Sequence, residues 1–149
     1  MNRKYKFVFV ASISLILSST ISIELDAFFL NTFYTVSGIM FSIGIGLVVT
    51  FNLQGIKNKS YIDEIRKNLN YVRNSYIQYF SLTTICFIID NYLRTENIDT
   101  TLKFSNKFSL PFNVQLFFFM IILYSIGYFI VNFLELQKLN NDIFDRMLE

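Results

Sequence analysis

Few side chains in this sequence could carry out covalent or metal chemistry. The 149 residues include no His and a single Cys, Cys86, which lies inside an apolar run. Imidazole is therefore missing as a metal ligand, general base or proton carrier, and neither a disulfide framework nor a cysteine zinc site can form. The sequence also lacks the short motifs typical of nucleotide-binding proteins, serine hydrolases and zinc proteases. We therefore predict a protein that is not an enzyme, has no catalytic residues and needs no metal or cofactor.

The ionisable residue placed deepest in an apolar stretch is Asp90, four residues before Arg94. A carboxylate at membrane mid-depth costs roughly 2.5–3.5 kcal/mol and often marks a functional path. Asp90 lies near the end of its apolar run, however, so we favour an ion pair with Arg94 on one helical face. Further along the chain, Asn132 is expected to hydrogen-bond between helices, and Glu135 to lie at a membrane edge.

Small side chains are spaced by four residues along the second apolar run and so share one helical face. They are Gly38, Ser42, Gly46 and Thr50. Small residues at this spacing let two helix backbones approach closely, and packing is the main attraction between helices in lipid. The partner could be another helix of the same chain, or the stripe could form a subunit interface or face a pore. Ser14 and Ser18 form a similar stripe on the first run, which favours tight packing of the first two helices.

A basic amphipathic stretch follows the second apolar run. Its apolar positions repeat at intervals of three and four residues: Ile62, Ile65, Leu69, Val72 and Tyr76. This spacing predicts one buried face of a helix, with Arg66, Lys67 and Arg73 turned away from it. The basic residues are expected to meet lipid headgroups or an acidic cytoplasmic partner.

The elements that must position these residues follow from the distribution of charge. Only 16% of residues are charged and 53% are hydrophobic, whereas soluble domains typically carry about 25% charged residues. No charge occurs between Asp26 and Lys57 or between Lys107 and Glu135, and each gap exceeds the ~20 residues that span a bilayer. Apolar runs occupy residues 7–23, 28–53, 76–93 and 112–134.

Helices are the expected form of these runs, because a helix satisfies its own backbone hydrogen bonds in lipid. We predict an all-α polytopic membrane protein, a single domain of four transmembrane helices. The alternative for the first run, a cleaved signal peptide, is disfavoured by its length and by the lack of a small-residue cleavage site. Between and after the spans lie a cytoplasmic linker (54–75), an outer loop (94–111) that could form a small hairpin, and a C-terminal helical extension (135–149).

Basic residues fix the predicted orientation, since cytoplasmic segments carry an excess of Lys and Arg. Ten of them lie in the N-terminus, the 54–75 linker and the C-terminus, against three in the outer loop. Both termini are therefore expected in the cytoplasm of a multi-pass protein. Helices two, three and four are expected to continue past the membrane there, with their apolar stripes packed together or a cytoplasmic partner docked on them.

Two segments resemble a known class of protein. Residues 34–69 read YTVSGIMFSIGIGLVVTFNLQGIKNKSYIDEIRKNL, and residues 129–142 read FIVNFLELQKLNND. A Gly- and Ser-rich helix followed by a basic amphipathic stretch, and an aromatic helix ending in Leu, Gln and Asn, are similar to small four-helix membrane proteins of bacterial anti-phage systems. They look like the membrane component of the Rex exclusion system and, less closely, the membrane subunit of the Kiwa system.

The resemblance implies a homo-oligomer in the bacterial inner (plasma) membrane that senses infection or perturbs the membrane, for example by forming a channel, often beside a soluble partner. It assigns no functional residue. The expected partners are the lipid bilayer, other copies of the chain and a cytoplasmic protein, with no direct nucleic-acid binding. The alternatives are a membrane-embedded immunity or scaffold protein that binds a partner, and a holin-like protein.

Overall fold

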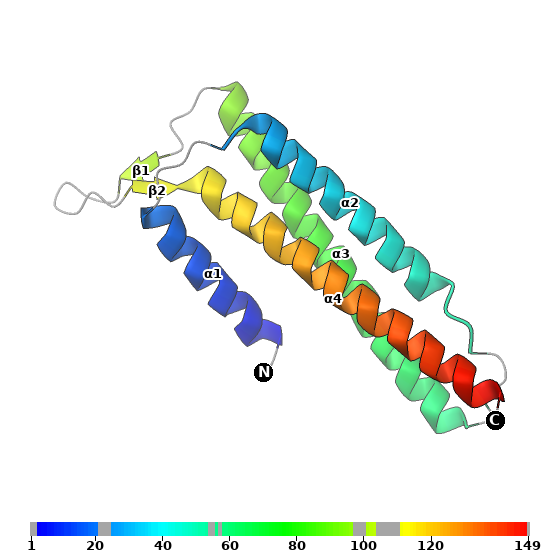
Figure 1. The fold of residues 1–149 in the computed structure, drawn as a ribbon. Coiled ribbons are helices and arrows are strands. Elements are labelled where there is room, and N and C mark those ends of the chain that lie inside the picture. Colours follow the sequence, from blue (N-terminus) through cyan, green and yellow to red (C-terminus); the bar gives the residue numbers. More distant parts are fainter. Residues whose placement is uncertain are drawn as a thin grey trace.

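The fold is given by a computed structural model, which describes residues 3–20, 25–53, 56, 58–96, 101–103 and 111–148. Four long helices dominate these residues: α1 (Arg3–Thr20), α2 (Ala27–Val49), α3 (Lys59–Thr95) and α4 (Val114–Leu148). α2, α3 and α4 pack against one another as a bundle, and α1 lies along the N-terminal part of α4 (Figure 1). The predicted all-α class is confirmed.

Polar side chains begin and end α2. The Asp26 carboxylate accepts a hydrogen bond from the backbone N–H of Phe28 at 3.2 Å, which satisfies one free donor of the first turn. At the other end the Thr50 N–H donates to the Gly46 carbonyl at 3.0 Å, and the chain then leaves the helix. The expectation that helix two continues past the membrane is therefore wrong. Asn52 and Gly55 follow directly, and both residue types are poor helix formers.

α3 and α4, in contrast, run on without interruption. α3 starts where the Asn58 side chain accepts from the Tyr61 N–H at 3.3 Å, and it continues for 37 residues. It joins most of the predicted 54–75 linker to the third apolar run, so that segment is helix rather than a separate linker. α4, at 35 residues, likewise joins the fourth run to the C-terminal extension, as predicted. At 1.5 Å per residue each is more than about 50 Å long.

A short hairpin lies between α3 and α4. β1 (Thr101–Lys103) pairs antiparallel with β2 (Pro111–Asn113), with Leu102 opposite Phe112. The hairpin expected in the outer loop is thus confirmed for these strands, while 97–100 and 104–110 lie outside the described residues. Asn113 then caps α4, since its side-chain oxygen accepts from the Leu116 N–H at 3.1 Å.

Three apolar clusters follow one another along the bundle. The cluster near the N-terminal end of α3 and the C-terminal end of α4 contains Val48, Ile65, Leu69, Leu136 and Ile143. The middle cluster is aromatic, with Tyr76, Tyr79 and Phe129. The cluster near the hairpin contains Leu30, Leu116, Phe119 and Ile122. The predicted packing of the inner apolar stripes of α3 and α4 is therefore confirmed.

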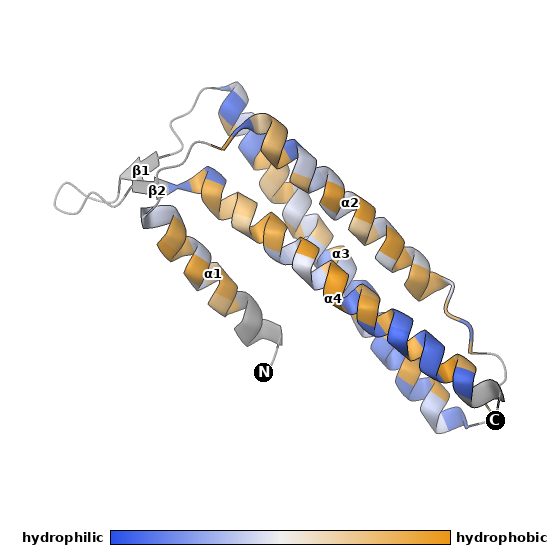
Figure 2. Ribbon diagram, in the orientation of Figure 1, coloured by the Kyte–Doolittle hydropathy of each residue, from blue (hydrophilic) through white to orange (hydrophobic). Residues whose placement is uncertain are grey.

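Two described helices, rather than the predicted four, are long and apolar enough to cross a membrane: α2 and the Val114–Asp145 part of α4. α1 offers a shorter apolar segment, Val8–Thr20, and the end of the first run at 21–23 lies outside the described residues. α3 is too polar by composition, because Gln78, Asp90 and Asn91 lie within its apolar run. Figure 2 shows α2 and the N-terminal half of α4 as mostly hydrophobic, with hydrophilic residues gathered where α3 begins and α4 ends.

Candidate functional site

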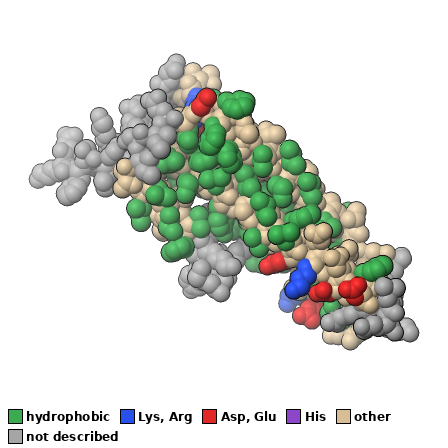
Figure 3. Space-filling view, in the orientation of Figure 1, with side chains coloured by type: hydrophobic (Ala, Val, Ile, Leu, Met, Phe, Trp, Pro, Cys, Tyr) green, Lys and Arg blue, Asp and Glu red, His purple; other side chains and the backbone are tan. Residues whose placement is uncertain are grey.

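Beside the apolar clusters, the bundle also buries several polar side chains, and it exposes large apolar ones. Several polar residues are fully buried: Ser14, Ser18, Ser37, Ser75, Thr83, Asp90 and Ser125. Large apolar residues on the same helices are exposed, including Ile77, Ile85 and Ile88 of α3 and Ile39 and Ile43 of α2. A helix of a water-soluble protein shows the opposite arrangement. On the face drawn in Figure 3, hydrophobic side chains cover the middle of the molecule and charges gather towards its ends.

The buried carboxylate of α3 forms an ion pair near the hairpin end. Arg94 Nε donates to Asp90 Oδ2 at 2.6 Å, which confirms the pair predicted from the four-residue spacing. Arg94 Nη1 also donates to the Leu25 carbonyl at 2.8 Å, so the pair ties α3 to the segment that leads into α2. The Asp90 side chain is only 1% exposed. This burial makes the pair a fixed internal contact rather than a charge at the surface.

Hydroxyl groups connect the helices at mid-bundle. Thr83 Oγ1 donates to Ser125 Oγ at 2.9 Å, and Ser125 in turn donates to the Ile121 carbonyl at 3.0 Å. Tyr34 and Thr84 share a further hydrogen bond, at 3.2 Å, between α2 and α3. Interhelical hydrogen bonds in a membrane contribute about 0.6 kcal/mol each on average. Sequence reasoning missed these residues, and the only available signal was the presence of hydroxyls inside apolar runs.

A close contact between helices involves Gly44 of α2, which sequence reasoning did not select. A Cβ atom at Gly44 would lie 2.0 Å from Tyr76 Cε1, so only glycine fits against this ring. The Tyr76 hydroxyl crosses to α4 and donates to the Phe129 carbonyl at 2.8 Å, and the two rings stack with centroids 4.8 Å apart. Gly44, Tyr76 and Phe129 therefore join all three helices of the bundle at one point.

Most of the predicted small-residue stripe on α2 faces away from this junction. Ser42 and Thr50 are exposed, and their hydroxyls bond to carbonyls of their own helix, those of Gly38 and Gly46, at 2.9 Å each. A Cβ at Gly46 would meet nothing within 4 Å, and only Gly38 lies near another helix, 3.8 Å from the Phe80 ring. The prediction that this stripe packs against another helix of the same chain is thus wrong for Ser42, Gly46 and Thr50. A subunit interface there stays a prediction.

The serine stripe of α1 is buried, but α2 is not its main neighbour. Ser14 and Ser18 are fully buried, and their hydroxyls donate to carbonyls within α1, those of Val10 at 2.8 Å and Leu15 at 2.9 Å. α1 packs mainly against α4 and β2. The expected tight packing of the first two helices is therefore wrong, because α4 lies between α1 and much of the bundle (Figure 1).

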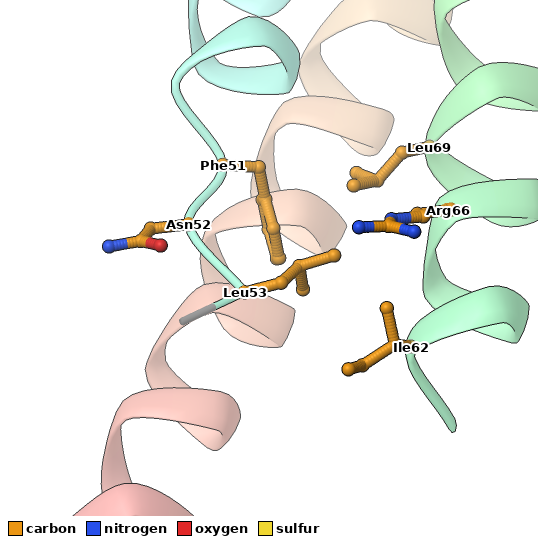
Figure 4. Close-up of a pocket in the computed structure, with 6 residues that line it drawn as sticks. All are labelled: Phe51, Asn52, Leu53, Ile62, Arg66 and Leu69. Atoms are coloured by element: carbon orange, nitrogen blue, oxygen red, sulfur yellow. The ribbon is translucent and has the colours of Figure 1, made fainter. Parts of the chain in front are cut away.

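The three basic residues of α3 do not form one site. Arg66, Lys67 and Arg73 are all exposed, as predicted. Arg66 lines a cavity of about 380 Å³, which it shares with Phe51, Asn52, Leu53, Ile62 and Leu69, whereas Lys67 and Arg73 lie outside that cavity. Figure 4 shows the Arg66 guanidinium turned towards the segment that follows α2.

Two polar residues in the C-terminal half of α4, Asn132 and Glu135, lie beside a second cavity, of about 300 Å³. Asn132 and Glu135 line it together with Leu69 and Leu136. Asn132 Nδ2 donates to the Tyr128 carbonyl of its own helix at 2.8 Å, so this hydrogen bond does not support the expected interhelical role. Glu135 is exposed, as expected for a residue at a membrane edge.

The described residues contain no group of three His, Cys, Asp or Glu side chains that could hold a metal ion, and Cys86 is a buried free thiol. What the described residues offer is a core that includes buried polar groups, an exterior with exposed apolar side chains, and a cavity with a cation at its wall. No family model, no curated protein and no solved structure matches this chain.

Proposed function

We propose that this chain is an integral membrane protein whose four helices all cross the bilayer, with both termini in the cytoplasm. The observation that carries the proposal is the inverted exposure of α3. Its buried face presents Tyr79, Thr83 and Asp90, and its outer face presents Ile85 and Ile88. The polar groups of Thr83 and Asp90 thus point inward, whereas Gln78 and Ser81 are exposed on α3 beside its apolar outer residues.

The lengths of α2, α3 and α4 agree with this arrangement. α2 has 23 residues and is about 35 Å long, slightly more than the ~30 Å hydrocarbon core. α3 and α4 extend beyond the point where α2 ends, and these extensions carry the exposed charges Arg66, Lys67, Glu135 and Lys138. In this proposal the extensions form a short helical pair on the cytoplasmic side, and the excess of basic residues supports that orientation.

Within the membrane, we propose that the protein acts without catalysis, as an oligomeric sensor or effector of bacterial anti-phage defence. Two features support this function. Residues 34–69 and 129–142 resemble membrane proteins of such systems. Ser42, Gly46 and Thr50 present small side chains to the outside of α2, where a second copy could approach closely.

Three measurements test the proposal in turn. The chain should stay in bacterial membranes after an alkaline carbonate wash, and reporters fused after Glu149 should give a cytoplasmic signal while reporters at Ser105 give the opposite. A periplasmic C-terminus would contradict the four-span topology. Expression in a susceptible host should then lower phage plating, and normal plating for every phage of a broad panel would contradict the defence role but not the topology.

A further inference from the structure

The cavity beside Arg66 lies where α2 ends and α3 begins its second turn. Phe51 and Leu53 line it from the segment after α2, and Ile62 and Leu69 from α3 (Figure 4). Their side chains turn towards one another across the cavity, while the Asn52 side chain turns away. The result is an apolar cavity with one cation, Arg66, at its wall.

Arg66 has no described acidic partner. No carboxylate in the part of the chain that the structure describes lies within ion-pair distance of its guanidinium, although Asp63 and Glu64 are close in sequence. A guanidinium presents five N–H donors in a planar fork that matches the oxygens of a phosphate group. The side chain is therefore available to an anion that enters the cavity.

The level of the cavity along the helices indicates which kind of anion it would bind. α2 ends at Val49, an apolar residue that is 73% exposed, and the apolar exterior of that helix stops there. In the proposed four-span arrangement, this level is the inner boundary of the hydrocarbon core. The apolar walls of the cavity match the acyl chain of a phospholipid, and the cation at that boundary matches its phosphate.

We propose that this cavity binds one anionic phospholipid of the cytoplasmic leaflet. Its phosphate accepts hydrogen bonds from Arg66, and the start of an acyl chain lies against Phe51, Leu53 and Leu69. Basic pockets between helices on the cytoplasmic side are suited to such headgroups. The neighbouring cavity contrasts with it, since Glu135 in its wall would repel a phosphate. The inference rests on the proposed membrane insertion.

The test uses the full chain purified in mild detergent, with bound lipids counted by native mass spectrometry. Wild type should retain phosphatidylglycerol in preference to phosphatidylcholine. Arg66→Gln should lower phosphatidylglycerol retention about fivefold, the effect of one basic residue near an anionic surface. Lys67→Gln is the matched control, because it removes the same charge from the next residue of α3, outside the cavity, and should lower retention less than Arg66→Gln does. Arg66→Lys, which keeps the charge, should lose less than Arg66→Gln.

Other results would overturn the inference. Equal losses for Arg66→Gln and Lys67→Gln would indicate general attraction to the basic surface. Equal retention of phosphatidylcholine would indicate apolar binding alone, and displacement by millimolar inorganic phosphate would indicate a site for a free anion. A carbonate wash separates the two proposals. A chain that is washed out contradicts the membrane function and this inference together, whereas a retained chain without lipid preference contradicts only the inference.

Discussion

Replacing Gly44 with Ala tests the helix junction at the centre of the bundle. The added Cβ would lie 2.0 Å from Tyr76 Cε1, and ordinary contact begins at 3.4 Å, so the ring must move by 1.4 Å or more. The ring has no free space to enter, because Tyr76 is fully buried and stacks on Phe129. A shift of that size would also stretch the 2.8 Å hydrogen bond from the Tyr76 hydroxyl to the Phe129 carbonyl.

The expected loss of stability follows from three terms. Overpacking a core costs about 1–3 kcal/mol, and a lost hydrogen bond costs about 0.5–1.5 kcal/mol. Alanine recovers up to about 1 kcal/mol over glycine inside a helix. We expect a net loss of about 2 kcal/mol, which lowers the midpoint of thermal unfolding by about 4–8 °C in a chain of this size.

The assay is thermal unfolding of the detergent-purified protein, with Gly46→Ala as the matched control. Gly46 is on the same helix, and a Cβ there meets nothing within 4 Å, so its midpoint should stay unchanged or rise slightly. In a Tyr76→Leu background the added methyl at position 44 should lose most of its effect, because its opposing ring is gone. Equal midpoints for Gly44→Ala and wild type would refute the reasoning, since α2 and α3 would then not meet at this register.

Three other predictions concern the remaining contacts. Arg94→Gln leaves the buried Asp90 carboxylate without its ion pair and should cost about 3 kcal/mol of unfolding free energy. Adding Asp90→Asn to the Arg94→Gln variant should recover most of that loss of unfolding free energy. No recovery would contradict the ion pair between the two residues. Thr83→Val and Ser125→Ala should show a coupling of about 0.6 kcal/mol in a double-mutant cycle, and additive effects would argue against their hydrogen bond. Gly46→Leu should leave the stability of the single bundle unchanged but reduce the oligomer mass in mild detergent, whereas an unchanged mass would show that this face meets lipid only.

Local spacing within one helix determined several features of this protein from the sequence alone. The charge-free gaps predicted α2 and the apolar half of α4, the four-residue spacing predicted the pair of Asp90 and Arg94, and the three–four repeat predicted the buried positions Ile65 and Leu69. Each of these needs only the geometry of a single helix, which places residues three or four apart on one face. The surplus of apolar residues likewise predicted the helical class.

Only the tertiary structure decided which face of each apolar helix turns inward. α2 is apolar all round, so its sequence offered the stripe with Ser42 and Gly46, whereas the structure buries Gly44, which lies about 200° away around the helix. The partners of Thr83 and Tyr76 were equally hidden, because Ser125 and Phe129 are 42 and 53 residues distant in sequence. In water, an apolar stripe would mark the inward face. When the outside must also be apolar, that signal disappears, and the fit of one side chain against another selects the face.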